Sequence, residues 1–184
     1  MPVILQDTRE KLDKHNNLLV DFEQFGFEVV KTKNVVGDYI LASQGNVSID
    51  IKQNMDEITN NIIHDHERFR NECIIAQKCG IKLIILIEED TSSIDILEGR
   101  WTYRPYNKQA KVCKANPKTV VKAMQTMRDN YGVRFYFTSK KYSAINVLRL
   151  LGYTYDDLKS MARNPIISKK LDDYRKEIKN VIHN

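Results

Sequence analysis

The segment Gly37-Asp38-Tyr39-Ile40-Leu41, followed closely by Ser48-Ile49-Asp50-Ile51-Lys52, decides the fold of this chain. Each half is a short apolar strand, and the turn residues Ser43-Gln44-Gly45-Asn46 separate them, so the pattern predicts a hairpin. In such a hairpin, Asp38 at the head of the first strand lies at the same end as Asp50 near the tail of the second. The sequence therefore predicts that two carboxylates meet across adjacent strands.

The spacing within the second strand adds a lysine to this pair. Side chains alternate between the two faces of a strand, so Asp50 and Lys52 project to one side while the isoleucines beside them face the other. Carboxylate oxygens suit Mg²⁺ or Mn²⁺, which keep several waters and can bridge to a phosphate. A bound metal lowers the pKa of its water, and a nearby lysine orients or helps to deprotonate that water and offsets the developing negative charge. A surface strand with alternating charge is the alternative, but the additional acids at Asp38 and Asp56 favour a site for phosphodiester hydrolysis.

The order of these residues resembles a known family. Gly37-Asp38, then Asp50-Ile51-Lys52 and, after three residues, Asp56 are similar to the pattern G-D-x(n)-E-R-K-x3-D of the XPF family of structure-specific endonucleases, a branch of the PD-(D/E)xK superfamily. Asp7-Thr8-Arg9-Glu10 resembles the family's opening D-x-R-E, and Arg68 lies where the family carries an arginine on the following helix. Two positions depart from the pattern, since the family has Glu at Asp50 and Arg at Ile51. We expect the first departure to preserve the charge and the second to affect substrate preference more than catalysis.

The resemblance covers about residues 3 to 151. It implies an α/β fold, with a restriction-endonuclease-like central mixed sheet flanked by helices. We expect residues 1–151 to form the nuclease domain and residues 152–184 to form a short helical C-terminal extension. Many family members carry tandem helix-hairpin-helix modules in that region, but the chain has no glycine after Gly152 for their hairpins.

The resemblance also implies further site residues. Asp7 and Glu10 are expected to complete the metal shell around Asp38, although either acid could instead stabilise a helix dipole. Arg9 and Arg68 are expected to hold phosphates, with surface salt bridges as the alternative. Asp56 is expected to fix a helix start or another side chain.

A basic and aromatic segment follows the central strand. It contains Arg100-Trp101-Thr102-Tyr103-Arg104 within a long irregular stretch, residues 91–115. Trp101 and Arg104 could stack on unpaired bases while nearby lysines follow the backbone of a nucleic acid. Trp101 could equally anchor the loop on the protein.

Periodicity and capping residues predict the remaining elements. The apolar spacing predicts one long helix from Met55 to Cys79, and the continuous apolar run from Lys82 to Ile87 predicts a strand covered on both faces. Asn116-Pro117 is typical of a helix start, and that helix should end before Gly132.

Composition agrees with a nucleic-acid partner. The chain has 184 residues, which suits one domain with a short appendage, and a net charge of +5. Its three cysteines are too scattered for a zinc site or a disulfide framework. The sequence contains no signal peptide and no apolar run long enough to cross a bilayer, so we expect a cytoplasmic protein without membrane contact. The resemblance makes a homodimer plausible.

These observations predict a Mg²⁺- or Mn²⁺-dependent endonuclease that acts on branched, flap or junction DNA. One alternative is a catalytically weak protein that binds DNA junctions or serves as a scaffold for a partner. Another is a general PD-(D/E)xK resolvase or a restriction-like nuclease.

Overall fold

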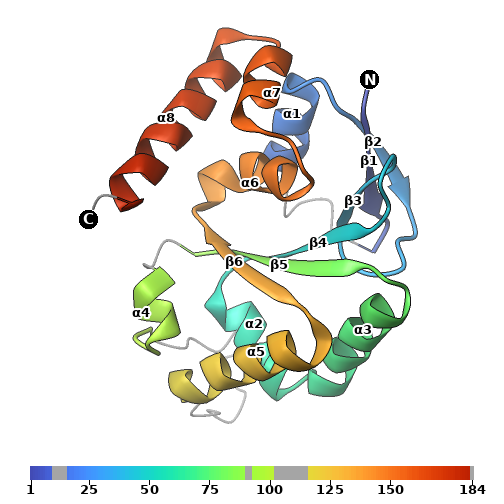
Figure 1. The fold of residues 1–184 in the computed structure, drawn as a ribbon, viewed down its shortest axis with the longest axis vertical. Coiled ribbons are helices and arrows are strands. Elements are labelled where there is room, and N and C mark those ends of the chain that lie inside the picture. Colours follow the sequence, from blue (N-terminus) through green and yellow to red (C-terminus); the bar gives the residue numbers. More distant parts are fainter. Residues whose placement is uncertain (10–15, 90–92, 102–115, 183–184) are drawn as a thin grey trace.

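A six-stranded mixed sheet with helices on both faces forms the molecule (Figure 1). The computed structural model describes residues 1–9, 16–89, 93–101 and 116–182. The strand order is β2-β1-β3-β4-β5-β6, in which β3 runs antiparallel to both of its neighbours and the other pairs are parallel. The expected α/β fold with a central mixed sheet is therefore confirmed. The strands are β1 (Val3–Asp7), β2 (Glu28–Thr32), β3 (Tyr39–Leu41), β4 (Val47–Lys52), β5 (Lys82–Glu88) and β6 (Arg134–Thr138).

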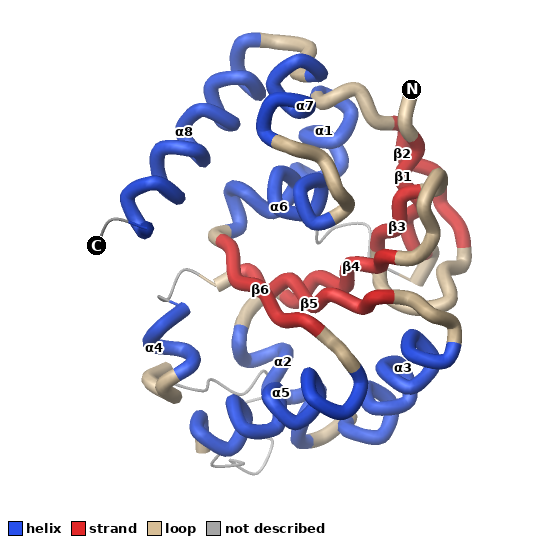
Figure 2. The backbone as a smooth tube through the Cα atoms, in the orientation of Figure 1, coloured by secondary structure: helices blue, strands red, loops and turns tan. Residues whose placement is uncertain are grey.

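The helices form two layers with the sheet between them, as the tube in Figure 2 shows. One layer contains α1 (Asn16–Gln24), α6 (Ser143–Leu150), α7 (Tyr155–Met161) and α8 (Pro165–Ile182), with the short 3-10 turn η2 (Lys140–Tyr142) leading into α6. The other layer contains α2 (Met55–Ile63), α3 (His66–Lys78), α4 (Ser93–Leu97) and α5 (Pro117–Tyr131).

Alternation along the central strands creates a core on each side of the sheet. In β5, Ile84 and Leu86 pack with the α1 and α6 layer, whereas Leu83, Ile85 and Ile87 pack with the α2, α3 and α5 layer. All five side chains are almost completely buried, as expected for a strand covered on both faces. The isoleucines of β4 face the α1 and α6 core, so the polar residues between them face the opposite layer.

The prediction of one long helix from Met55 to Cys79 is wrong, because the chain breaks between α2 and α3. The backbone N–H groups of His64 and Asp65 both donate to the carbonyl of Asn60, and a new helix starts when Phe69 N donates to the carbonyl of Asp65. Asp65 occupies the N-cap position of α3. The apolar positions on the two sides of the break remain in helical phase, so periodicity alone could not reveal it.

Asn54 and Glu57 cap the start of α2, and the expected role of Asp56 there stays a prediction. The side chain of Asn54 accepts a hydrogen bond from the backbone of Glu57, and Oε2 of Glu57 accepts one from the backbone of Gln53. Asp56 lies in the first turn, where a negative charge stabilises the helix dipole.

The C-terminal extension packs on the same core as the rest of the chain. Leu158 of α7 and Ile167 and Leu171 of α8 are fully buried in a cluster that includes Phe22 of α1. The expected helical extension is therefore present as part of the α1 and α6 layer, while its separation from residues 1–151 as a distinct domain stays a prediction. None of the helices in the described ranges, including the 18-residue α8, is long and apolar enough to cross a membrane.

Candidate active site

The hairpin of β3 and β4 places Asp38 beside Asp50. Tyr39 is paired with Ile49, and the backbone N–H of Asp38 donates to the carbonyl of Ile49 over 2.8 Å. Oδ2 of Asp38 in turn accepts a hydrogen bond of 2.7 Å from the backbone of Ile51. The Asp38 carboxylate thus reaches across to β4 next to Asp50, as the sequence predicts.

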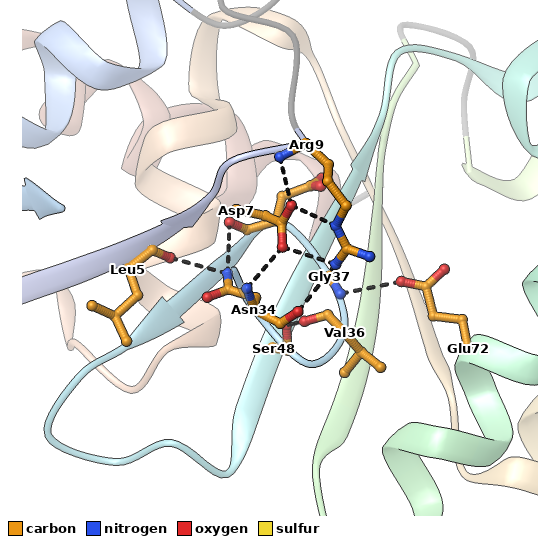
Figure 3. A network of polar contacts seen from close by, with 9 residues as sticks. Leu5, Asp7, Arg9, Asn34, Val36, Gly37, Ser48 and Glu72 are labelled. Carbon is orange, nitrogen blue, oxygen red and sulfur yellow. Dashed lines mark hydrogen bonds and ion pairs between the residues drawn. The ribbon is translucent and has the colours of Figure 1, made fainter. Parts of the chain in front are cut away.

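Asp7 at the end of strand β1 also lies beside Asp38, because the backbone N–H of Asp7 donates to the carbonyl of Asp38 over 2.8 Å. Both Asp7 oxygens are occupied, since Arg9 donates from its backbone, Nε and Nη2 at 2.7 to 2.8 Å and Asn34 donates from its backbone at 2.9 Å (Figure 3). Burial alone would raise the pKa of Asp7, but these hydrogen bonds outweigh it and lower the pKa. Asp7 is therefore an ionised carboxylate held by Arg9, whose side chain is 61% exposed.

Asp50 and Lys52 form a buried ion pair that faces the α2 and α3 layer. Lys52 Nζ lies 2.9 Å from Oδ1 and 2.7 Å from Oδ2 of Asp50, and the two residues are only 7% and 4% exposed. Burial would lower the pKa of Lys52, but the charges of Asp50 and Asp38 outweigh this effect, so the pKa is raised and the amine is charged. Oδ2 of Asp50 is buried, and its contact with Nζ is an ion pair without the alignment of a hydrogen bond.

These residues line a cleft of about 860 Å³ between α3 and the end of the sheet at which β1 and β4 terminate. Asp7, Arg9 and Asp38 form one wall, and Arg68 of α3 forms part of the other. The Arg68 side chain is 64% exposed, and its ion pair with Asp65 spans 3.8 Å, so little holds the guanidinium away from a ligand in the cleft. The structure therefore brings Lys52, both predicted arginines and three of the four predicted acids to one cleft, the three acids being Asp7, Asp38 and Asp50.

Glu72 of α3 is a cleft residue that sequence reasoning missed. Its Oε1 accepts a hydrogen bond of 3.1 Å from the backbone of Gly37, the residue before Asp38 (Figure 3). Burial and the nearby charge of Asp50 raise the pKa of Glu72. A signal was present, because Glu72 follows Arg68 by four residues and therefore lies on the same face of the helix.

Three predicted residues do not contribute to this description of the cleft. Trp101 lies away from it, half-buried against the core beneath α2, α3 and α5, and its buried Nε1 has no hydrogen-bond partner among the described residues. This packing agrees with the alternative in which Trp101 anchors the loop, and a contact with DNA stays a prediction. Glu10 and Arg104 lie outside the described residues.

Comparison with known proteins assigns the family. The model of the ERCC4 domain matches residues 6–151. The chain belongs to the ERCC4 domain family. This is a family of structure-specific nucleases, so the expected relationship to the XPF endonucleases is confirmed.

A solved structure shares the fold of this ERCC4 domain. The structure of XPF from Aeropyrum pernix aligns over 95% of this chain and 69% of its own, with 16% sequence identity and a TM-score of 0.54. At this identity the similarity concerns the fold. No curated protein matches the chain.

The cleft of this ERCC4 domain offers oxygen ligands for a divalent metal. Asp38 and Asp50 supply hard carboxylate oxygens, and those of Asp50 are held by the ion pair with Lys52. Within the described ranges, no group of three or more His, Cys, Asp or Glu side chains is arranged to hold a metal ion. Two carboxylates suit Mg²⁺ or Mn²⁺, because Mg²⁺ is usually held by one or two carboxylates while water and substrate phosphate fill the other positions.

Proposed function

We propose that this protein is a Mg²⁺- or Mn²⁺-dependent endonuclease that hydrolyses phosphodiester bonds in branched, flap or junction DNA. The observation that carries the proposal is the placement of Asp38 and Asp50 beside Lys52 in one open cleft. The family is one of nucleases, and the net charge of +5 favours a polyanionic substrate.

Each cleft residue has a role that follows from its position. Asp38 and Asp50 would hold the metal, which when bound would lower the pKa of the attacking water and neutralise phosphate charge. Lys52 is fixed by Asp50 and offsets the negative charge that develops on the phosphate. Arg9 and Arg68, both largely exposed on opposite walls, can hold the phosphates on either side of the scissile bond.

Asp7 supports this site in a different way. Because Arg9 and Asn34 occupy both of its oxygens, Asp7 would need to release Arg9 before it could bind a metal. Its position therefore favours a role in holding Arg9 and the end of β1 beside Asp38, rather than direct metal binding.

Cleavage of end-labelled flap, fork, four-way-junction and duplex DNA tests the proposal, with Mg²⁺, Mn²⁺ or EDTA and with the variant Asp38→Asn. Asparagine keeps an oxygen that can accept the hydrogen bond from Ile51, so the hairpin should remain folded while the metal ligand loses its charge. We expect cuts near the branch that require a divalent metal, and at least about a 100-fold loss of rate in Asp38→Asn with unchanged DNA binding.

The matched control is Asp156→Asn, which removes one exposed carboxylate from the first turn of α7 outside the cleft. It should lose less than about twofold in rate. Full activity in Asp38→Asn would contradict the assigned site. Specific binding without cleavage under any metal would favour a junction-binding scaffold instead.

A homodimer is a further part of the proposal. Tyr136 on the edge strand β6 is 43% exposed, and Leu97 of α4 is 54% exposed beside the same surface hollow. Exposed apolar side chains at the edge of a sheet favour association with another chain. Light scattering of wild type and Tyr136→Glu would test whether this edge pairs two copies.

A further inference from the structure

Helix α3 separates the catalytic cleft from a second groove. Arg68 and Glu72 face the cleft, whereas His66, Phe69 and Arg70 line a groove of about 420 Å³ between α3 and α5. The two helices lie side by side below the sheet (Figure 1). A helix with its side chains is about 10–12 Å wide, so a nucleic-acid strand that leaves the cleft needs to cross only that width to enter the groove.

The groove has an apolar floor. Ile62 of α2 and Phe69 of α3 line it with Ala123 and Met127 of α5. Phe69 belongs to the core on this side of the sheet, and Ile62 and Met127 pack against that core. Tyr131 adds an aromatic side chain to the lining. Apolar and aromatic surfaces of this kind accept the flat faces of unstacked bases without sequence preference.

The rim of the groove is basic. His66, Arg70 and Lys122 line it, and no Asp or Glu of the described residues does. The Nε of Arg70 donates to the hydroxyl of Tyr131 over 2.9 Å, which fixes the guanidinium at the rim. Its Nη groups and the Nζ of Lys122 make no hydrogen bond or ion pair with the part of the chain that the structure describes. A polyanion that also carries flat apolar groups complements this surface.

We propose that the groove between α3 and α5 binds the unpaired strand of a branched DNA substrate. The phosphates pair with Arg70 and Lys122, and the bases lie on the floor against Tyr131. This inference rests on the proposed nuclease function, because it requires DNA in the neighbouring cleft. It deepens that function by assigning the single-stranded arm, and not the duplex, to a defined surface.

Two single variants alter the groove without touching the cleft. Lys122→Glu reverses a rim charge, and Thr126→Glu places a carboxylate at an exposed position that also lines the groove. The matched control is Lys176→Glu, which makes the same change of net charge on α8, in the helix layer on the opposite side of the sheet. Fluorescence anisotropy in EDTA would compare a flap substrate with a plain duplex of equal length.

We expect each groove variant to weaken binding of the flap substrate about 5–10-fold and binding of the duplex less than about twofold, with Lys176→Glu close to wild type. Photo-crosslinking of 5-iododeoxyuridine placed in the single-stranded arm should label Tyr131 or His66. Equal losses on flap and duplex, or crosslinks confined to other surfaces, would overturn the proposal.

The same substrates, tested with Mg²⁺ or Mn²⁺, separate this inference from the proposed nuclease activity. Cleavage by the wild type with unchanged flap affinity in both groove variants would remove the groove proposal alone. Flap-selective binding through the groove without cleavage under any metal would keep the groove and remove the nuclease assignment. A change of oligomeric mass in Lys122→Glu without a change in flap affinity would assign the groove to a second copy of the chain and overturn the inference.

Discussion

Gly37 determines where the Asp38 carboxylate lies. Its φ is +67°, a backbone conformation that residues with a side chain rarely adopt. A Cβ at this position would lie 2.3 Å from Oγ of Ser48 and 3.2 Å from the carbonyl oxygen of Ile49. Ser48 cannot easily move away, because it is fully buried and its hydroxyl donates to the carbonyl of Val36. The glycine is therefore required both by backbone conformation and by the close approach of β4.

Gly37→Ala should lower the free energy of unfolding by about 2–5 kcal/mol, which combines the cost of a left-handed alanine with that of overpacking. Urea denaturation would measure this loss, and cleavage should fall because Asp38 is displaced. Gly45→Ala is the control, since Gly45 has the same φ of +67° but nothing within 4 Å of its added Cβ. It should cost only about 1–2 kcal/mol. Equal losses in the two variants would show that contact with β4 does not matter.

The alternation of side chains along a strand made the positions of several site residues predictable from the sequence. Asp38, Asp50 and Lys52 lie together because alternation along β4 and the antiparallel pairing with β3 fix their directions. Glu72 could not be placed in the same way, because no local rule sets the position of α3 over the sheet. The placement of Asp7 beside Asp38 also depends on how β1 joins β3, which is a long-range contact.

At the scale of elements, the sequence predicts best where capping residues mark an end. Helix α5 starts after Asn116 and ends at Gly132 as predicted, because Asn116 accepts a hydrogen bond from the backbone of Lys118 and Gly132 adopts a φ of 71°. The break between α2 and α3 was missed because it contains neither proline nor glycine. Residues 64 to 67 around the break are polar and exposed, so the break leaves the helical spacing of the buried apolar residues unchanged.

The contact between α7 and α8 should respond to pH through Asp172. Its carboxylate accepts hydrogen bonds from Lys159 Nζ at 2.7 Å and from the hydroxyl of Tyr155. These bonds, first from Lys159 and then from Tyr155, lower the pKa of Asp172 below its ordinary value of 3.8. A lowered pKa means that the contribution to stability is present above pH 3.8 and is lost as the pH falls through the lower, folded-state value.

We therefore expect Asp172→Asn to lower the melting temperature by a few degrees at neutral pH, and this difference from wild type to shrink as the pH falls below about 4. Thermal melts between pH 7 and pH 2.5 would check this. Glu28→Gln is the control, since this exposed side chain on β2 makes no hydrogen bond or ion pair with any described residue. A melting-temperature difference between Asp172→Asn and wild type that stays constant with pH would contradict the assigned ion pair.

At the scale of the whole molecule, the core extends beyond the segment that defines the family. The ERCC4 domain match ends at residue 151, yet buried side chains continue to Tyr174 in α8. The sequence indicates a charged helical tail, but the surface that it covers depends on how α1 and α6 pack, which no local pattern specifies.

A chain that ends at residue 151 should not fold stably. It would lose the side chains of Leu158, Ile167, Leu171 and Tyr174, and burial of each is worth about 1.5–3 kcal/mol. The total of about 6–12 kcal/mol is comparable with the whole stability of a typical domain, about 5–15 kcal/mol. Circular dichroism during urea denaturation should therefore show no cooperative transition for the shortened chain.

Two neighbouring substitutions in the full chain test whether the buried side chains of α8, and not merely the presence of the C-terminal segment, stabilise the protein. Ile167 is 1% exposed and Ile166 is 77% exposed, so the pair differs in burial but not in chemistry. Ile167→Ala should cost about 2–5 kcal/mol, whereas Ile166→Ala should stay within about 0.5 kcal/mol of wild type. A cooperative transition in the shortened chain at the wild-type midpoint, with equal and small effects of both alanines, would mean that residues 1–151 fold independently and that α7 and α8 only rest on them.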